Sequence, residues 1–427
     1  MKLRQLASVV LLAAPLWLGV SSPVQAATLV VANTNNDGAG SLRQAIIAAN
    51  ASTGADTIGF APGVTGTITL GSDFPILTYD LTVTGPGEDD LVIDGANAFR
   101  PFWVEPGVSF TLSGVTLQNG FYEYERGSLI HNQEGTLNVT DVTFRDDRGW
   151  AATFNLSGGS SATFTRCSFI NNSVGIGGDH GTTPDTTSNV EADYTNRTYV
   201  IDSLFENNDR GIRQERFTKV TGSTFRNNTY GAEIRGLNRS QILNSTFEGN
   251  TVAINHANWT DTSWTLLGAN NRFINGNSFS NNTTTIELRD GFNNGQNSQR
   301  WSTITDNTWD GENTWISAIE WDGTANQAIT KTTVNTIDQA WTESGNIIRL
   351  STPPSTTPAP APVIEETTTT TTSTLAPPPA VVEPTPVPTR ANALPETGTS
   401  FGLVPLVLSL FAVSGGVLLI RRRWSRV

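Results

Sequence analysis

The hexapeptide STFRNN at residues 223–228 returns as STFEGN at residues 245–250. Looser copies are CSFINN at 167–172, SLFENN at 203–208 and NSFSNN at 277–282. We take the third residue of each copy as an anchor, and eight anchors can be aligned: Leu117, Phe144, Phe169, Phe205, Phe225, Phe247, Phe279 and Trp309. Their separations run from 20 to 36 residues. A repeat near 20–25 residues with occasional insertions is typical of stacked-repeat proteins.

The residues around the anchors indicate which kind of repeat this is. Five residues before each anchor lies an apolar residue: Leu112, Val139, Phe164, Val200, Val220, Ile242, Ile274 and Ile304. Three residues before each anchor lies a turn former in seven of eight copies: Gly114, Asp141, Arg166 (the exception), Asp202, Gly222, Asn244, Gly276 and Asp306. The pattern therefore predicts a strand, a one-residue bend and a second strand, with inward side chains at a spacing of two.

Asn follows the anchors in most copies, often as a pair. Asn tolerates the left-handed backbone of a sharp corner, and stacked Asn side chains can form hydrogen-bonded ladders. These features together predict an all-β fold, a right-handed parallel β-helix. The Leu spacing of a leucine-rich repeat is absent from this sequence. A β-sandwich is also disfavoured, because its strands would not keep one inward position through eight copies.

Earlier coils are expected at residues 81–95 and 102–114. Ser41 and Gln44 have the spacing of a capping box, and Leu42, Ala45, Ile46 and Ala49 share one helical face, so we expect a short helix covering the first coil. The stretch VANTNNDGAGSLRQAIIAAN at 31–50 resembles the opening segment of secreted bacterial β-helix proteins. The resemblance to the pectate-lyase-like β-helix superfamily covers roughly residues 28–350 and implies architecture rather than activity.

The N-terminus has the organisation of a secretory signal peptide. Lys2 and Arg4 precede an apolar run that closes on Val24-Gln25-Ala26, so cleavage is expected after Ala26. The alternative, a permanent membrane anchor, requires a longer apolar run.

The C-terminus contains a second candidate targeting segment. Residues 401–420 are free of charge and long enough to span a bilayer, and an Arg cluster follows them. Just ahead stand Leu394, Pro395, Glu396, Thr397 and Gly398. This order resembles the LPxTG cell-wall sorting signal of Gram-positive surface proteins. The resemblance implies that a sortase cleaves after Thr397 and joins it to peptidoglycan on the outer cell surface.

Four segments follow from these assignments. They are a signal peptide at 1–26, a β-helix domain at 27–350, a Pro/Thr-rich wall-spanning linker at 351–393 and the sorting signal at 394–427. The 427-residue chain has a formal net charge of −13, which becomes −19 when both basic ends are removed. That acidity argues against nucleic acid as a partner and weakens binding to polyanionic sugars unless a cation bridges them. The single Cys excludes an internal disulfide.

Charged residues recur in the strand that follows each Asn corner. With Ile212, Ala232, Ile254 and Ile286 pointing inward, the pattern predicts outward pairs at Arg213 with Glu215, Glu233 with Arg235, Asn255 with Ala257, and Glu287 with Arg289. One interpretation is a salt-bridge ladder on a solvated face. The other is a substrate groove, because β-helix polysaccharide lyases and glycosidases use this lateral surface, with acids for proton transfer or metal binding.

Other candidates are less specific. The insertion at 177–198 brings Asp179, Asp185, Glu191 and Asp193 into one loop, which is either a Ca²⁺ site or a plain acidic loop. Cys167 and His256 are expected to be buried fillers, and Trp309 is expected in the core. Other Trp residues gather in the C-terminal third as potential sugar-stacking faces: Trp259, Trp264, Trp301, Trp315, Trp321 and Trp341.

Three functional hypotheses remain from the sequence. The leading one is a wall-anchored, adhesin-like surface protein that binds glycans or a neighbouring surface. The alternatives are a wall-displayed polysaccharide lyase or glycoside hydrolase, and a structural rod. The paired Asp and Gly-His-Gly motifs expected from β-helix galacturonases are absent from the sequence.

Overall fold

The computed structural model describes eleven stretches of the chain. They are residues 26–122, 127–156, 159–178, 197–214, 217–235, 240–257, 272–289, 302–311, 313–321, 326–332 and 341–348. All of them belong to one compact unit, residues 1–356. The predicted linker and sorting signal lie outside the described residues. Within the described stretches no helix is long and apolar enough to cross a membrane.

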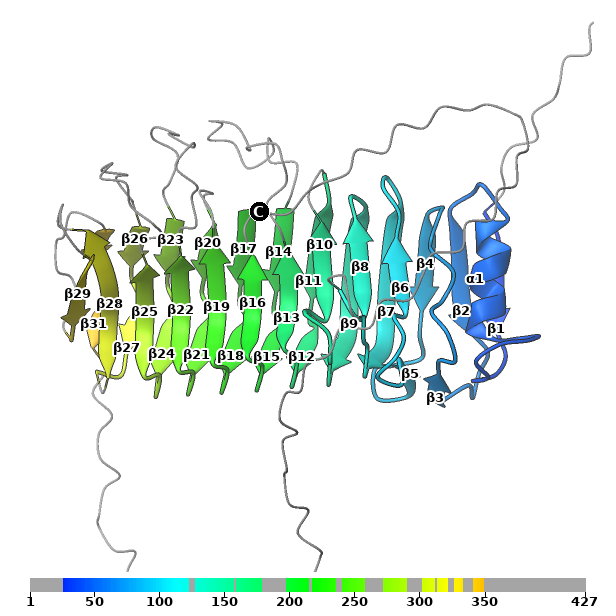
Figure 1. Cartoon of the computed structure of the whole chain (residues 1–427), viewed down its shortest axis with the longest axis horizontal. Coiled ribbons are helices and arrows are strands. Elements are labelled where there is room, and N and C mark those ends of the chain that lie inside the picture. Colours follow the sequence, from blue (N-terminus) through cyan, green and yellow to red (C-terminus); the bar gives the residue numbers. More distant parts are fainter. Residues whose placement is uncertain are drawn as a thin grey trace, which may run out of the picture. The chain divides into compact units, whose positions relative to one another are not determined.

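Two parallel sheets run through the unit (Figure 1). The ten-stranded sheet contains β6 (Phe102–Val104), β8 (Ile130–Gln133), β10 (Thr153–Leu156), β13 (Val174–Gly178), β16 (Arg210–Gln214), β19 (Tyr230–Arg235), β22 (Val252–Ala257), β25 (Thr284–Arg289), β28 (Thr314–Trp321) and β29 (Asn326–Lys331).

The 21-stranded sheet begins with β1 (Thr28–Val31), β2 (Asp56–Phe60), β3 (Gly66–Thr69), β4 (Leu81–Thr84), β5 (Leu91–Asp94), β7 (Ser109–Gln118), β9 (Thr136–Arg145), β11 (Ser161–Thr165), β12 (Ser168–Ile170), β14 (Arg197–Ile201) and β15 (Leu204–Glu206). It continues with β17 (Phe217–Thr221), β18 (Thr224–Arg226), β20 (Gln241–Leu243), β21 (Thr246–Glu248), β23 (Arg272–Asn275), β24 (Ser278–Ser280), β26 (Ser302–Thr305), β27 (Thr308–Trp309), β30 (Trp341–Ser344) and β31 (Ile347–Ile348).

Each strand pairs with its counterpart in the next coil, in register with the repeat. Phe205 pairs with Phe225, and Phe225 pairs with Phe247. Among the described strands every pairing is parallel except that of β28 with β29. The predicted parallel β-helix is therefore confirmed, and the coils at 81–95 and 102–114 are present as β4 to β7.

The anchors form the core. All eight are buried, and so are all eight residues five positions earlier. Phe rings of successive coils stack nearly parallel: the Phe205–Phe225 and Phe225–Phe247 ring centroids are each 4.6 Å apart. This distance is close to the spacing of neighbouring strands, so each coil supplies one layer of the stack.

The one-residue bend is also confirmed. All eight residues three positions before an anchor have positive φ, between 49° and 67°. Arg166, which is not a turn former, adopts φ 50° and is held by a two-pronged hydrogen bond to Asp141 of the preceding coil, at 2.7 and 2.8 Å. Neighbouring coils therefore stabilise the bend where the local residue does not favour it.

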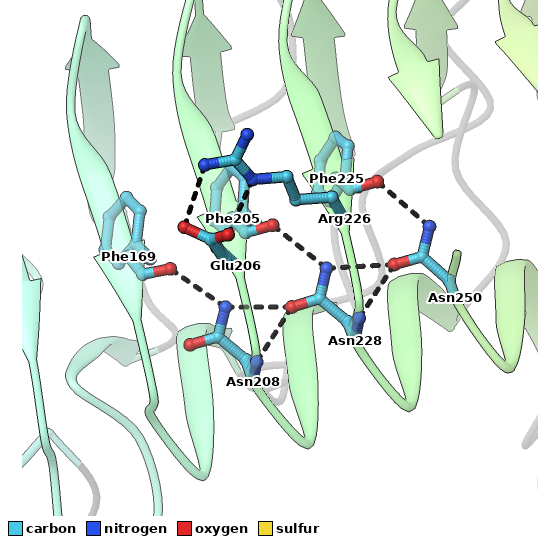
Figure 2. Close-up of polar contacts among 8 residues, drawn as sticks. All are labelled: Phe169, Phe205, Glu206, Asn208, Phe225, Arg226, Asn228 and Asn250. Atoms are coloured by element: carbon cyan, nitrogen blue, oxygen red, sulfur yellow. Dashed lines mark hydrogen bonds and ion pairs between the residues drawn. The ribbon is translucent and has the colours of Figure 1, made fainter. Parts of the chain in front are cut away.

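The two Asn residues of each corner have different roles. The first residue of the pair, as in Asn207 and Asn227, has positive φ and is exposed. The second is buried and forms a ladder through Asn172, Asn208, Asn228, Asn250 and Asn282. Asn228 donates to the Phe205 carbonyl and to Asn250 Oδ1, both at 3.0 Å, and its own Oδ1 accepts from Asn208 (Figure 2). The ladder satisfies the backbone polar groups that a corner would otherwise leave unpaired.

A second ladder lies two residues before the anchors, where the sequence has Ser and Asn. The backbone N–H of Ser203 donates to Ser223 Oγ, and that of Ser223 donates to Ser245 Oγ. Asn277, Asn307 and Asn346 continue the line. These small polar residues are inward-facing, so their hydrogen bonds remove the cost of burying them.

The helix expected near the N-terminus is present as α1 (Leu42–Asn50), packed against β1 and β2. Its four predicted apolar residues are buried. Ser41 Oγ accepts from the backbone N–H of Gln44, as expected of an N-cap, while the Ser41 N–H donates to the Gly38 carbonyl. Figure 1 shows α1 at the β1 end of the stack.

Candidate functional site

The most chemically varied face of the described residues is the outer side of the ten-stranded sheet. Its strands place one column of side chains in register, which we call the outer column: Trp103, His131, Phe154, Gly177, Arg213, Glu233, Asn255, Glu287 and Ser317. The residue before each of these faces the core, as the buried Ile212, Ala232, Ile254 and Ile286 show. The register predicted from the sequence is therefore confirmed.

Glu233 is the centre of the charged part of the column. Its Oε2 lies 2.8 Å from Arg210 Nε and 3.8 Å from Arg213 Nε. Glu233 is only 4% exposed, whereas both arginine side chains remain about a quarter exposed. A buried carboxylate needs compensating charge, and here two guanidinium groups from the preceding coil supply it.

The two arginines also cover aromatic rings. The Arg213 guanidinium lies 4.7 Å from the Trp150 ring centroid, and that of Arg210 lies 5.1 Å from the Tyr230 ring centroid. Trp150 and Tyr230 are half-buried. Cation–π stacking and the shared Glu233 ion pair restrict both guanidinium groups, so the surface is held in one arrangement.

Trp150 reaches its position because Gly177 has no side chain. A Cβ at Gly177 would lie 2.7 Å from the Trp150 ring and 2.9 Å from the Phe154 ring. Trp150 packs edge-on against Phe154, and with Ala151 and Val174 they form a small apolar cluster separate from the main core. This cluster anchors the ring on the outside of the sheet.

The column begins with further aromatic residues. His131 lies between Trp103 and Phe154, with ring centroids 4.9 and 6.3 Å away. Arg100 places its guanidinium 3.9 Å from the Tyr122 ring centroid and 5.2 Å from that of Trp103. Trp103 Nε1 donates to Gln133 at 3.1 Å. An Arg stacked on an aromatic residue therefore occurs at both ends of the aromatic segment.

Toward the C-terminal coils the column becomes purely polar. Asn255, which is 2% exposed, donates a hydrogen bond to Glu287 Oε2. The interpretation of the column as a freely solvated face is therefore wrong for Glu233 and Asn255. Salt bridges do connect coils, but the acid that Arg210 and Arg213 share, Glu233, is buried, and Arg210 was not among the predicted residues.

Several predicted site residues lie wholly or partly outside the described residues. Arg235 and Arg289 lie on β19 and β25 in the expected register, but their side chains lie outside what the structure describes. Glu215 lies wholly outside it, as do Asp179, Asp185, Glu191 and Asp193 of the insertion and Leu394, Pro395, Glu396, Thr397 and Gly398 of the sorting motif. No group of three or more potential metal ligands occurs among the residues that are described.

Predictions about single buried residues can be compared with the structure. Cys167 is buried, and burial raises the pKa of its thiol to about 12, as befits an inert core residue. His256 is buried in a column with Ile234 and Leu288. Trp309 is in the core, and Trp315 is also buried, with its Nε1 donating to Glu343 at 2.8 Å. Trp315 is therefore not a free stacking face.

The sequence pattern missed Arg210 and Trp150. Arg210 comes three residues before Arg213, at the start of the strand, where the pattern places a corner rather than a functional residue. Trp150 stands outside any strand, six residues after an anchor. The one available signal was the pair of glycines at 177–178 within a strand, which indicates close approach of another group.

No protein-family model matches the chain, and no curated protein sequence matches it. Among solved structures it is similar to a tailspike protein mutant of E. coli bacteriophage HK620 in complex with a pentasaccharide, with 15% identity over 72% of this chain and 62% of that one, at a TM-score of 0.40. A double mutant of that tailspike matches with 15% identity over 63% of this chain and 57% of that one, at a TM-score of 0.38. The A-module of the Azotobacter vinelandii mannuronan C-5 epimerase AlgE4 matches with 14% identity over 65% and 95% of the two chains, at a TM-score of 0.33.

The chain spans less than two thirds of the length of either tailspike. At these identities and TM-scores the similarities do not bear on the chemistry of the outer column.

Proposed function

We propose that this protein is exported, anchored to the cell wall of a Gram-positive bacterium, and binds a neutral polysaccharide on the outer face of its ten-stranded sheet. Export and anchoring are supported by sequence patterns: residues 1–26 have the organisation of a signal peptide, and residues 394–427 have an LPxTG-like motif, an apolar run and a basic tail in the order of a sorting signal. The linker at 351–393 then carries the β-helix through the wall.

The observation that carries the binding proposal is the stacking of two arginines on two half-buried aromatic rings around Glu233. The parts of Trp150 and Tyr230 that remain exposed beside the guanidinium groups supply apolar surface for a pyranose. Arg210 and Arg213, each about a quarter exposed, present their guanidinium groups to its hydroxyls. Because the ion pairs already hold these groups, little side-chain entropy is lost when a ligand binds. The choice of a neutral polymer follows from the acidity of the chain and from the two acids beside the two arginines, Glu233 against both of them and Asp209 against Arg210.

The test uses the chain from Ala27 to Val427 in a mild detergent and a panel of neutral and acidic polysaccharides. Retention of a neutral polymer is expected, with a loss of roughly ten- to hundredfold in affinity for Trp150→Ala, as expected when an aromatic anchor is removed. Tyr199→Ala is the matched control, because Tyr199 is a half-buried aromatic residue on the other sheet. Equal losses in both variants, or retention only of acidic polymers, would contradict the proposal.

New reducing ends or unsaturated products are measured in the same reactions. Cleavage that disappears in Glu233→Gln would replace the binding proposal with that of a polysaccharide lyase or hydrolase. Neither binding nor cleavage would favour the structural rod.

Anchoring is tested in a Gram-positive host that has a sortase. The wild-type chain is expected in the wall fraction, and Thr397→Ala is expected in the membrane fraction and the medium. An unchanged distribution would show that the motif at 394–398 is not the attachment signal.

A further inference from the structure

Asp56 lies at an inward position where the following coils carry apolar residues. It pairs in register with Leu81, which continues through Phe110, Leu137 and Ala162. Those four residues are buried in the main core, and Asp56 itself is 2% exposed. A carboxylate at such a position is costly unless a positive charge and hydrogen bonds compensate it.

Among the described residues the Asp56 carboxylate has one hydrogen-bond partner, which is a backbone group. The backbone N–H of Ala27 donates to Asp56 Oδ1 at 2.6 Å. Asp56 Oδ2 is buried and has no hydrogen-bond partner among the described residues. No salt bridge joins Asp56 to a Lys, Arg or His in the described part of the chain. A peptide N–H therefore faces a carboxylate that can accept further hydrogen bonds and that has no counter-charge among the residues described.

Ala27 is the residue that signal cleavage would make the first of the mature chain. Hydrolysis of the Ala26–Ala27 peptide bond consumes one water and leaves a carboxylate on Ala26 and, at neutral pH, an ammonium on Ala27. The nitrogen that now carries one N–H would then carry three and a positive charge. Ala26 is exposed, so the bond to be cut lies at the surface of the described residues.

We infer that the Asp56 carboxylate is a preformed binding site for the α-ammonium group that removal of the signal peptide creates on Ala27. This inference rests on the proposed export and adds to it a structural role for processing. The new ammonium donates to both carboxylate oxygens, which satisfies Oδ2 and neutralises the buried charge.

The position of the nitrogen is already fixed by strand pairing. Thr57 N donates to the Ala27 carbonyl at 2.9 Å, and Thr28 pairs with Thr57 at the start of β1. Cleavage therefore requires no rearrangement to form the ion pair. The pair would join the start of β1 to the start of β2, the two strands against which α1 packs, and so stabilise the first coil only after processing.

The experiment compares two chains that end at Val427 and begin at either Ala27 or Ala26, each released from a tag by a protease that leaves the stated first residue. The extra residue moves the amine by about 3.8 Å along the chain and restores the peptide N–H at Ala27. With Asp56 present, the chain beginning at Ala27 is expected to have an unfolding equilibrium constant roughly ten- to hundredfold lower in urea, the range of a charge-assisted hydrogen-bonded pair. With Asp56→Asn, the two starting points are expected to differ by less than about twofold.

A second readout does not depend on the folding of the Asp56 variant. In the chain beginning at Ala27, labelling of the α-amine by an amine-reactive ester is expected to be at least about tenfold slower in buffer than in urea. Equal stability of the two starting points, or labelling that is equally fast in buffer and in urea, would overturn the inference.

Both measurements use a defined first residue, so they are independent of where cleavage occurs in the cell. N-terminal sequencing of the protein from its wall fraction tests that separately. A first residue other than Ala27 would overturn the processing role, whereas failure of polysaccharide binding would leave it standing.

Discussion

Asp147 occupies the first position of the Asn corner ladder, where the next coils carry Asn172 and Asn208. Its Oδ1 accepts hydrogen bonds from Ser128 Oγ and from the Gly149 backbone N–H. Its Oδ2 is buried and has no partner among the described residues. Burial raises the pKa of the Asp147 carboxyl to about 7, against an opposing contribution from the Gly149 hydrogen bond.

The raised pKa has a definite effect on stability. The folded state favours the neutral acid, whereas the unfolded state ionises from about pH 4. The free energy of unfolding is therefore unaffected by Asp147 below about pH 4, falls as the pH rises toward 7, and is constant above that pH. A change from 3.8 to about 7 corresponds to roughly 4 kcal/mol of unfolding free energy lost at pH 8, of which roughly 3 kcal/mol is lost between pH 5 and pH 8.

Asp147→Asn is expected to remove this cost. The Oδ1 of the introduced amide can keep the bonds from Ser128 and Gly149, and its Nδ2 replaces the atom that lacks a partner. Each ladder Asn donates to the anchor carbonyl of the preceding coil, as Asn172 does to Phe144, so the introduced amide would donate to the Leu117 carbonyl. The variant is expected to be more stable than the wild type by several kcal/mol at pH 8 and by much less at pH 5.

Urea unfolding curves at pH 5 and pH 8, followed by far-UV circular dichroism, measure both differences. Asn208→Asp is the matched control, because a carboxylate there would face the Phe169 carbonyl and Asn228 Oδ1, which now accept hydrogen bonds from Asn208. It is expected to lose more stability at pH 8 than at pH 5. An Asp147→Asn variant that is less stable at pH 8, or that keeps the pH dependence of the wild type, would refute the reasoning.

Three further substitutions test the corner, the bend and the core by the same urea assay. Asn228→Ala is expected to lower the free energy of unfolding by roughly 2–4 kcal/mol, because its neighbours lose their hydrogen-bond partners. Asn227→Ala, at the exposed corner residue beside it, is expected to cost only about 1 kcal/mol. Equal costs would contradict a stabilising role of the Asn ladder. Gly222→Ala is expected to cost about 1–2 kcal/mol, since φ is +63° and the new Cβ would lie 2.3 Å from Asp202 Oδ1, and the cost should shrink in an Asp202→Ala background. Phe225→Ala is expected to cost about 3–5 kcal/mol, because its ring stacks on both sides at 4.6 Å, and a cost below about 1 kcal/mol would show that the stack does not stabilise the core.

The proposed polysaccharide site and the proposed receptor for the processed N-terminus lie in different parts of the described unit. The outer column involves strands from β6 to β28, whereas the Asp56 receptor joins β1 to β2. Variants at one place are therefore not expected to alter the other, which makes each set a control for the other.

The sequence by itself determined the coil. An apolar residue five positions before each anchor, a bend three positions before and an Asn after it are local features, and each is repeated often enough to be recognised without the structure. These features were enough to predict the parallel β-helix, the inward register of Ile212 and Ile254, and the burial of Cys167 and His256. A repeated backbone conformation puts equivalent residues in equivalent places, so the repeat alone carries this information.

The tertiary structure alone decided which residues meet between coils. Arg210 pairs with Glu233 of the next coil, and Trp150, which lies outside any strand, stacks with Arg213. Asp56 accepts a hydrogen bond from Ala27, a residue 29 positions away. The insertions make the coils unequal in length, so the sequence separation of two neighbours does not follow from the repeat. Pairing across coils depends on side-chain length, on missing side chains such as that of Gly177, and on burial, and these exist only once the coils are stacked.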